Sequence, residues 1–537
     1  MPSDTSVVID IEASIQTSRM PEKRSKRGRF IVNVVANVAN FLVGSVLGLW
    51  FTPYLIRHLG LSAYGVVPLA MTVTSYLAVI TLALNSAVGR YITIAIEQGD
   101  QRQASRFFNT SLFGSIFLVL IFLIPAGWLS LNAAYLFRVP IGYERDAQIL
   151  LACTIFAFFL TEIDSAFDVV TYCRNRFDLR NLSTMAAQVI RVGLVVALFR
   201  LATPKIWHIG FGILLAALMS FFLSVRWARS LMPNLTINIK DFSLGVVRQL
   251  TSTGGWILIN QIGTMLIVSI DLIVVNRFFG PEQSGKYASI MQWSLLLRSF
   301  ALVISGVFGP TVMSLYAKED IDGLILYVRR GVKFLGMLIA LPVGLLCGFS
   351  SPLLSLWLGN EFEYLSPLMA LMIFPLALNL GYLPLHHVSM ATNRVKLPAI
   401  IQIIVGALNL ILALSFAGPL HLGMYGVALS GIISLSLRNL LFTPIYTALI
   451  LRKGMLTFVR EIIPLVLMGV GVAIISAGLS HSIRITNWQT LIFAGVLVSI
   501  VYFIGIWLGL LNAEERLIVY RLVPISLRMP KHVPEKA

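Results

Sequence analysis

The sequence predicts an all-α protein that crosses a membrane about 14 times, because of its composition, its apolar runs and the placement of its charges. Of 537 residues, 57% are hydrophobic and only 12% are charged, with a mean hydropathy of +0.85. That leaves too little charge for a soluble surface. Apolar runs of about 20 residues, enough to cross a hydrocarbon core of about 30 Å, recur from Phe30 nearly to the C-terminus. Helices are expected, since each satisfies its own backbone hydrogen bonds.

The apolar runs divide into 14 spans: 30–55, 63–86, 109–132, 148–171, 182–200, 206–225, 250–276, 287–314, 334–357, 364–391, 397–417, 424–451, 461–480 and 488–511. With the N-terminus in the cytoplasm, 30 of the 41 lysines and arginines fall in cytoplasmic segments, 8 in outward loops and three within spans. Cytoplasmic loops of membrane proteins carry this excess. The net charge of +17 therefore reflects topology, with help from anionic inner-leaflet lipid, and no nucleic-acid motif accompanies it.

The first 29 residues are polar and end in a basic cluster at 23–29. The apolar run that follows is too long for a signal-peptide core and has no small-residue cleavage pattern behind it. We therefore expect a retained basic tail, with both termini in the cytoplasm. The three cysteines are scattered through apolar sequence, which indicates neither a disulfide framework nor a metal site.

The sequence repeats itself at an offset of about 220 residues. The turn Gly60–Gly65 (GLSAYG) falls on Gly280–Gly285 (GPEQSG). Four further single or paired positions also match: Asn40 with Asn260, Gly89 with Gly309, Asp100 with Asp320, and Asn175-Arg176 with Asn393-Arg394. The expected domains are a basic tail (1–29), a six-helix half (30–228), an amphipathic cytoplasmic linker (229–249), a second six-helix half (250–452), two further spans (453–511) and a cytoplasmic tail (512–537). An even number of helices per half predicts a parallel, pseudosymmetric repeat around a central cavity.

Three arginines, Arg191, Arg298 and Arg438, lie within spans, where each costs about 2.5–3.5 kcal/mol unless paired or hydrated. Asp164 and Arg191 are equally far from the loop at Phe177, which predicts a structural pair, with a transport role as the alternative. Asp271 and Arg298 differ in depth by about 10 Å, which favours water or a ligand in a cavity. For Arg438, cavity lining and internal pairing both stay open.

The first span opens with N33-V-V-A-N37-V-A-N40, and helical spacing places its three carboxamides within about 60° on one face. They predict either helix packing or a polar cavity lining, and the repeat favours lining for Asn40 and Asn260. Arg90 is either a substrate contact or a cytoplasmic anchor. The pair His386-His387 predicts helix packing more than a proton relay. No nucleotide loop or metal spacing occurs, so no cofactor is expected beyond a possible coupling ion, H⁺ or Na⁺.

Three stretches carry a resemblance to a known family: the asparagine-bearing first helix, T52-P-Y-L-I-R-H-L-G-L-S-A-Y-G65, and G89-R-Y-I-T-I-A. The chain resembles the polysaccharide or oligosaccharide flippases of the multidrug/oligosaccharidyl-lipid/polysaccharide (MOP) exporter superfamily. The resemblance implies an inner-membrane protein that flips a polyprenyl-diphosphate-linked oligosaccharide to the outer face by alternating access, for O-antigen, capsule or exopolysaccharide synthesis.

The resemblance also implies which residues bind substrate, because helices 1, 2, 7 and 8 line the cavity in related exporters. It places Asn33, Asn37, Asn40, Asn260, Asp271 and Arg298 on lining helices. Guanidinium groups suit a diphosphate, so Arg298, Arg90 and Arg438 are candidates for the headgroup. Asp271 would repel a diphosphate, and ion coupling or gating is its expected role.

Two other classes of function are weighed against the flippase. A multidrug or organic-cation antiporter of the same fold would need a carboxylate-rich cavity, and the three arginines within spans count against it. A membrane glycosyltransferase or polymerase would need a long outward loop, and the longest expected one has about 15 residues, at 132–146. We therefore expect a transporter and not an enzyme. Its partners would be the bilayer, the lipid-linked oligosaccharide and possible polymerase or assembly proteins, and it would function as a monomer.

Overall fold

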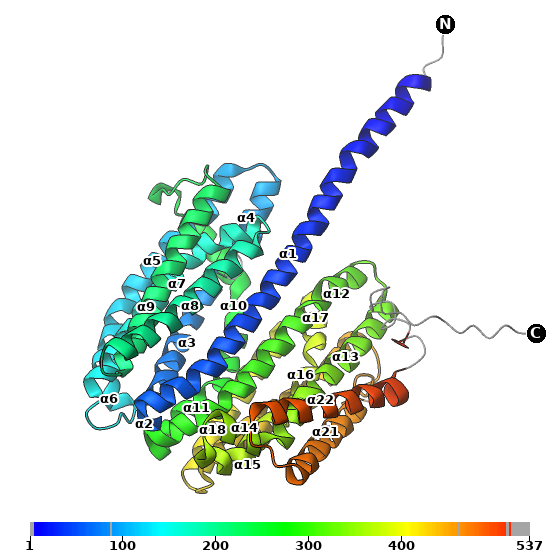
Figure 1. Ribbon diagram of the computed structural model, residues 1–537. Coiled ribbons are helices and arrows are strands. Elements are labelled where there is room, and N and C mark those ends of the chain that lie inside the picture. The colour runs from blue at the N-terminus through cyan, green and yellow to red at the C-terminus, as the bar shows by residue number, and fades with distance from the viewer. Residues whose placement is uncertain (1–4, 86–87, 460–461, 512–514, 517–537) are drawn as a thin grey trace, which may run out of the picture. The chain divides into compact units, whose positions relative to one another are not determined.

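The computed structural model describes residues 5–85, 88–459, 462–511 and 515–516. Within these ranges it consists of helices joined by short turns and contains no β-strand (Figure 1). The prediction of an all-α protein is therefore confirmed. The expected C-terminal tail at 512–537, apart from residues 515 and 516, and the first four residues of the N-terminal tail lie outside the described residues.

Contacts within the chain divide it into two compact units, and the three boundaries fall inside helix α11, between α17 and α18, and inside helix α19. Unit 1 comprises Met1–Gln292 and Val395–Ser434. Its helices are α1 (Thr5–Leu59), α2 (Leu61–Tyr64), α3 (Val66–Asn85), α4 (Val88–Glu97), α5 (Gln101–Leu131), α6 (Ala133–Leu136), α7 (Glu144–Cys173), α8 (Phe177–Leu201), α9 (Ile206–Leu231), the 3₁₀ helix η1 (Ile239–Asp241), α10 (Leu244–Val268), most of α11 (Ile270–Gly306), α18 (Lys396–Ala417) and α19 (Gly423–Ser436).

Unit 2 comprises Trp293–Arg394 and Leu435–Ala537. Its helices are the end of α11, α12 (Phe308–Ala317), α13 (Ile321–Gly348), α14 (Ser350–Trp357), the 3₁₀ helix η2 (Asn360–Leu365), α15 (Ser366–Ile373), α16 (Leu376–Gly381), α17 (Leu383–Ala391), the π-helix η3 (Leu437–Phe442), α20 (Thr443–Ile450), α21 (Ile462–Ser482), α22 (Trp488–Gly505) and the π-helix η4 (Ile506–Leu510). The two units are defined by contacts within the chain, whereas the two halves expected from sequence are defined by the repeat. The division into two halves therefore stays a prediction.

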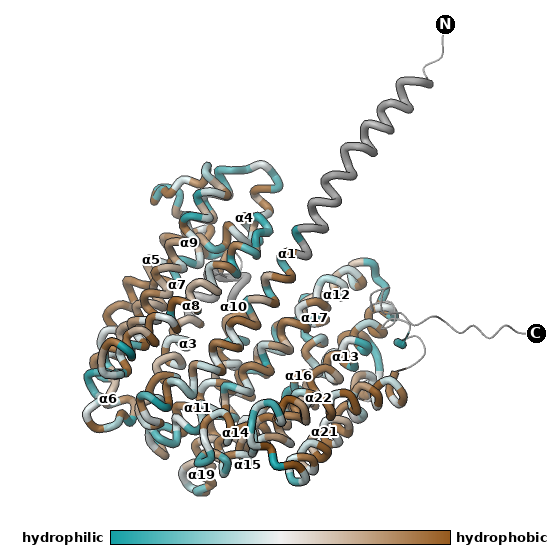
Figure 2. Tube along the Cα trace, viewed as in Figure 1, coloured by the Kyte–Doolittle hydropathy of each residue, from teal (hydrophilic) through white to brown (hydrophobic). Residues whose placement is uncertain are grey.

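The described residues contain 13 helical segments that are long and apolar enough to cross a membrane. Figure 2 shows hydrophobic residues along the bodies of the helices and hydrophilic ones at many of the turns. Spans 7 and 8 of the prediction overlap one segment, Gly255–Ala317, whose 63 residues exceed one crossing about threefold. Gly280, at φ 88° and ψ 180°, interrupts its helix. The segment is therefore long enough for two crossings, and the count of 14 stays a prediction.

Backbone geometry recurs at the offset of the sequence repeat. Gly60 and Gly280 both have positive φ angles, 81° and 88°, in the matched turns. Asn175 and Asn393, a matched pair near the ends of α7 and α17, have φ angles of 54° and 53°. Left-handed backbone is uncommon for residues other than glycine, although asparagine tolerates it. The matched positions of the sequence repeat therefore also share their local backbone conformation.

Helix capping recurs at the same offset. Asp100 precedes α5 and accepts a hydrogen bond from the backbone N–H of Gln103 at 2.9 Å. Asp320 precedes α13 and accepts one from the N–H of Gly323, also at 2.9 Å. Both aspartates satisfy a donor that the first helical turn leaves without a partner. The symmetry axis expected between the halves stays a prediction.

The two matched turns pack directly against each other within unit 1. A Cβ atom on Gly65 would lie 2.2 Å from the carbonyl oxygen of Pro281 and 2.9 Å from the nitrogen of Gly285. A Cβ atom on Gly285 would lie 2.5 Å from the carbonyl oxygen of Leu61. Leu61 matches Pro281 and Gly65 matches Gly285 in the repeat, so the contact is reciprocal. We call these four residues the glycine seam.

Candidate functional site

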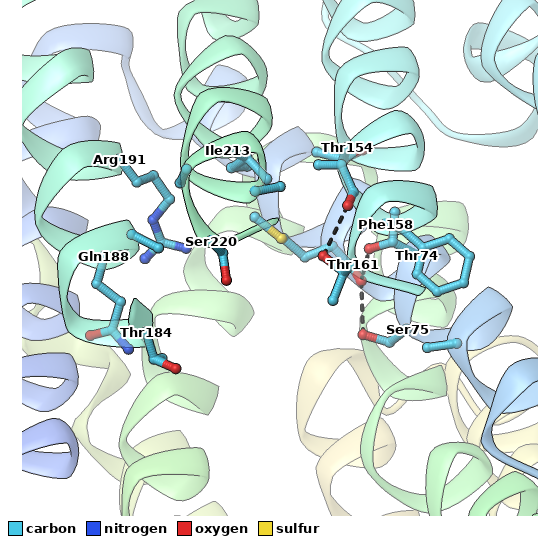
Figure 3. A pocket seen from close by; sticks show the side chains of 16 residues that line it. Thr74, Ser75, Thr154, Phe158, Thr161, Thr184, Gln188, Arg191, Ile213 and Ser220 are labelled. Atoms are coloured by element: carbon cyan, nitrogen blue, oxygen red, sulfur yellow. Dashed lines mark hydrogen bonds between the residues drawn. The ribbon is translucent and has the colours of Figure 1, made fainter. Parts of the chain in front are cut away.

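A cavity of about 450 Å³ lies among α3, α7, α8 and α9 of unit 1. This volume falls within the range of about 300–1,000 Å³ that is usual for ligand pockets. Figure 3 shows Thr184, Gln188 and Arg191 of α8 facing residues of α3 and α7 across it. The polar lining residues are Thr74, Ser75, Thr154, Thr161, Thr184, Gln188, Arg191 and Ser220, set among alanines, Met71, Phe158 and Ile213.

All six hydroxyl groups of the lining already donate their protons inside the protein. Five bond to backbone carbonyl oxygens of their own helices and one to a carboxylate: Thr74 and Ser75 to Met71 (both 2.9 Å), Thr154 to Leu151 (2.9 Å), Thr161 to Ala157 (2.9 Å), Thr184 to Arg180 (3.1 Å) and Ser220 to Asp164 Oδ2 (3.3 Å). A hydroxyl has one proton and two lone pairs. The hydroxyls therefore present hydrogen-bond acceptors to the cavity.

Arg191 is the lining residue that brings charged donors. Its guanidinium has five N–H groups and no acceptor, and its buried Nε has no hydrogen-bond partner. The buried Oε1 of Gln188, one turn away, also has none. No aspartate or glutamate lines the described cavity. The cavity thus joins a wall of acceptors to one positively charged donor group.

The predicted Asp164–Arg191 pair is wrong for this structure. Asp164 is buried and accepts a hydrogen bond from Ser220 of α9, and its Oδ1 has no partner. Asp168, one turn further along α7, pairs with Arg180 at 2.8 Å. Within the described part of the chain, no ion pair joins Asp164 to Arg191. Equal depth in adjacent helices does not set rotation about each helix axis, and α7 turns Asp164 toward α9.

Asn33 and Asn37 pack α1 against the start of α8. The Nδ2 of Asn33 donates to the carbonyl oxygen of Asn175 at 3.1 Å, and its Oδ1 accepts from the N–H of Asp178 at 3.3 Å. Asn37 Oδ1 accepts from Asn181 Nδ2 at 2.7 Å. Of the two readings open from sequence, helix packing describes these contacts, so the substrate-binding role expected for Asn33 and Asn37 finds no support in them.

The turn that receives Asn33 carries its own ion pair, between Arg176 and Asp178 at 2.9 Å. The hydrogen bonds from the guanidinium to the Asp178 carboxylate raise the pKa of Arg176 above its ordinary value. The connection between α7 and α8 is therefore held by both charge and carboxamide contacts.

Asn40 lies level with the cavity. Asn37 meets Asn181, and a Cβ on Gly44 would lie 3.1 Å from Gln188 Oε1, so α1 and α8 run in register at an offset of 144 residues. The same offset sets Asn40 beside Thr184, a lining residue. The buried Oδ1 of Asn40 has no hydrogen-bond partner. Polar lining therefore stays the interpretation for Asn40.

Asn260 and Arg90 lie in unit 1, outside the lining of the cavity. Asn260 is half-buried on α10, and its carbonyl oxygen accepts a hydrogen bond from the hydroxyl of Thr264 at 2.9 Å. Arg90 is exposed on α4. Neither residue lines the cavity, and their proposed roles in substrate binding stay predictions.

Asp271 sits in a buried polar cluster near the start of α11. Its Oδ2 accepts from the hydroxyl of Tyr287 at 3.2 Å, and its Oδ1 accepts from Asn409 Nδ2 of α18 at 3.1 Å. Asn409 is fully buried, and its Oδ1 has no hydrogen-bond partner. A Cβ on Gly431 of α19 would come within 3.3 Å of Asp271 Oδ2. Its own helix α11 and the two consecutive helices α18 and α19 thus enclose the Asp271 carboxylate.

The other two arginines within spans lie in unit 2. Arg298 is half-buried on α11. Arg438, in the π-helix η3, donates from Nη2 to His386 Nε2 at 3.0 Å and from Nη1 to Asn439 Oδ1 at 3.4 Å. His387 contacts the carbonyl oxygen of Ser305 at 2.9 Å. Internal pairing thus describes Arg438, and helix packing describes both histidines.

In the described part of the chain, no three His, Cys, Asp or Glu side chains are placed to hold a metal ion. Cys153, Cys173 and Cys347 are free and half-buried.

Comparison with known proteins gives a family match over more than half of the chain. The model of a family described as polysaccharide biosynthesis protein matches residues 30–315. The uncharacterized membrane protein EpsK of Bacillus subtilis (strain 168) is 34% identical over 493 residues, which are 92% of this chain and 98% of that protein. A putative O-antigen transporter of Shigella flexneri is 24% identical over 436 residues, 78% of this chain and 97% of the transporter.

Two solved structures of membrane transporters have a similar fold. The lipid II flippase MurJ in an inward closed conformation has a TM-score of 0.63 at 16% identity, covering 89% of this chain and 98% of MurJ. An inward-facing multidrug resistance MATE transporter has a TM-score of 0.57 at 15% identity, covering 81% and 98%. The chain therefore belongs to the polysaccharide biosynthesis protein family and has the fold of the MOP superfamily of membrane transporters.

Proposed function

We propose that the protein flips a polyprenyl-diphosphate-linked oligosaccharide from the cytoplasmic to the outer face of the inner membrane by alternating access. The family membership and the similarity to a putative O-antigen transporter support a role in moving a glycan. The observation that carries the proposal is the cavity wall of unit 1, where six hydroxyls present acceptors beside one guanidinium.

A sugar is complementary to that wall because its hydroxyls are hydrogen-bond donors as well as acceptors. Its O–H groups would bond to the lining hydroxyls and to Gln188 Oε1, whose lone pairs are available. Arg191 would hold an acceptor or an anionic substituent of the sugar. An uncharged apolar ligand would leave these groups without partners, at about 1–3 kcal/mol for each buried one.

An organic-cation antiporter fits the cavity less well. A cation would meet a guanidinium and would find no carboxylate in the described lining. Asp164 does not line the cavity, and its carboxylate accepts a hydrogen bond from the lining residue Ser220. Like charges at close range in a low-dielectric site repel strongly. The lining therefore favours a neutral or anionic ligand.

The diphosphate of the carrier lipid needs cations elsewhere along the path. Arg298, Arg90 and Arg438 stay the candidates proposed from sequence, with Asn260 and Asn40 as polar lining. Of these, Arg438 already donates to His386, and any headgroup would share or displace that bond. Asp271, enclosed by Tyr287 and Asn409, is proposed for ion coupling or gating.

The glycine seam is a contact that could close one end of the transport path in alternating access. The expected topology puts the turns at 60–65 and 280–285 at the outward ends of their helices, where Gly65 and Gly285 let two backbones touch. We propose that this contact closes the outward end and that release of substrate requires the turns to separate.

The function is tested by deleting the gene in the native host and isolating its lipid-linked oligosaccharides. The proposal expects accumulation of a complete repeat unit that is inaccessible to a glycosidase added outside spheroplasts. Expression of wild-type protein should restore export, and Arg191→Ala at equal membrane abundance should not. An incomplete repeat unit would indicate a glycosyltransferase. Normal oligosaccharide with new sensitivity to organic cations would indicate an antiporter, and either outcome would overturn the proposal.

A further inference from the structure

A second cavity, of about 470 Å³, lies in unit 1 beside the glycine seam and apart from the site described above. Its walls come from two stretches that are far apart in sequence. One is α6 with the following residues to Val139, and the other is the turn of α11 that contains Arg277, Gly280 and Pro281. In the repeat, the first stretch belongs to the N-terminal half and the second to the C-terminal half.

A buried carboxamide joins the two walls. Asn276 is 0% exposed. Its Oδ1 accepts from the backbone N–H of Arg138 at 2.9 Å, and its Nδ2 donates to the carbonyl oxygen of Arg138 at 3.2 Å. The guanidinium Nη1 of Arg138 donates to the carbonyl oxygen of Phe278 at 3.3 Å. The backbone of Arg138 is thus fixed against the helix that carries Arg277, so hydrogen bonds hold the two walls of this cavity together.

The charge of this cavity is unbalanced. Arg138 and Arg277 both line it, and no aspartate or glutamate does in the described part of the chain. Glu282, the acid in the same turn, is paired with Lys286 at 2.7 Å. Arg138 uses one N–H group on a backbone oxygen and keeps the others available. Two guanidinium groups without a carboxylate favour an anion, and the guanidinium fork matches the geometry of a phosphate or a carboxylate.

The surroundings of the cavity expose aromatic and apolar side chains. Tyr135, a lining residue, is 90% exposed, and Ile141, in the same loop, is 97% exposed. Exposed tyrosines are typical of the membrane–water interface, where an aromatic ring and a polar hydroxyl are both accommodated. Phe137 and Val139 add apolar surface to the lining. A ligand here would set its anion between the arginines and its chain against these apolar groups.

We propose that this cavity binds the phosphate group of a membrane lipid, held between Arg138 and Arg277 at the outer surface of the membrane. The ligand is either the diphosphate of the flipped carrier lipid or the headgroup of an anionic phospholipid. The outer placement rests on the topology of the proposed function. Because the anion touches both repeats beside the seam, it would bind where the outward turns part.

Native mass spectrometry of the full-length protein in detergent tests the site. The probes are a polyprenyl diphosphate without sugar, phosphatidylglycerol and inorganic phosphate, each titrated separately. We expect Arg138→Gln with Arg277→Gln to lower the bound fraction of at least one lipid probe about tenfold, and the double lysine variant to recover part of it. Arg145→Gln, an exposed arginine in the first turn of α7 that lies outside the cavity, is the matched control and should bind as wild type.

The outcomes separate the sources of the ligand. Loss confined to polyprenyl diphosphate assigns the carrier, and loss of phosphatidylglycerol assigns a phospholipid. Unchanged lipid binding in the double glutamine variant, or equal loss in Arg145→Gln, would overturn the proposal. A photoreactive lipid phosphate applied to wild-type protein gives a readout that needs no variant, and labelling should fall on residues 134–139 or 277–281. Failure here would leave the accumulation of oligosaccharide in the deletion strain unchanged, so the two proposals fail separately.

Discussion

Replacement of Gly65 by alanine is the sharpest test of the glycine seam. Gly65 has φ −58° and ψ −22°, which alanine adopts without strain. Any effect of Gly65→Ala therefore comes from the contact and not from the backbone. The added Cβ would lie 2.2 Å from the carbonyl oxygen of Pro281, whereas ordinary contacts begin near 3.4 Å. The two turns must separate by about 1 Å to admit one methyl group.

The size of the effect follows from that overlap. Forcing an extra methyl group into a well-packed contact costs about 1–3 kcal/mol. If the contact exists only while the outward end is closed, that cost falls on the closed state alone. A difference of this size shifts a two-state equilibrium about 5- to 150-fold toward the open state. Gly285→Ala should act in the same direction, because its Cβ would lie 2.5 Å from the carbonyl oxygen of Leu61.

Thiol labelling measures the shift. Ala63, in the turn itself, is 2% exposed. In a protein whose three native cysteines are replaced, Ala63→Cys should react with a maleimide only when the turns part, at a rate proportional to the open population. Gly65→Ala should raise that rate at least fivefold. Gly127→Ala is the matched control, since its Cβ would meet no atom within 4 Å. Labelling and melting temperature both equal to the parent would refute the seam as a closure.

Three further predictions concern the polar residues. Arg191→Ala should lower polymer export at least tenfold at equal membrane abundance, and Arg191→Lys should retain part of it, because a charged hydrogen bond contributes about 1.5–3 kcal/mol; full export by the alanine variant would exclude a substrate contact. Asp271→Asn keeps the size of the side chain but removes its charge, so transport into proteoliposomes should stop responding to imposed H⁺ or Na⁺ gradients, and an unchanged response would remove Asp271 from coupling. Asn37→Ala should lose the bond to Asn181, about 0.5–1.5 kcal/mol, and lower the melting temperature while export continues; lost export at unchanged stability would instead indicate a ligand contact.

Hydropathy was sufficient to predict an all-α membrane protein with many spans, because each spanning helix must carry about 20 apolar residues whatever surrounds it. The repeat was also readable, and its most local elements recur in the structure. Gly60 and Gly280 share a backbone conformation that needs glycine, and Asp100 and Asp320 cap helices in the same way. Signals of this kind depend on a few neighbouring residues, which is why they can be recognised in the sequence.

The candidate cavity was not predicted, although part of its signal was present. Thr184, Gln188 and Arg191 stand at i, i+4 and i+7, one face of α8. Depth along the membrane can be counted from sequence, but rotation of each helix cannot. Counting residues from the loop therefore matched Arg191 with Asp164, whereas in the structure Asp164 accepts a hydrogen bond from Ser220. Threonines and serines in apolar helices also commonly bond their own backbone, so they gave no separate sequence signal.

The state of the cavity hydroxyls has a consequence for selectivity. The hydroxyls of Thr74, Thr154 and Thr161 already donate hydrogen bonds to backbone carbonyl oxygens. A ligand must therefore be the donor in every hydrogen bond that it makes to them. Lone pairs accept over a broad range of directions, so such a wall distinguishes poorly between epimers of a sugar. Discrimination then rests on Arg191 and on the size of the space. A transporter built in this way would tolerate changes of monosaccharide in its glycan far better than the loss of one anionic or carbonyl group.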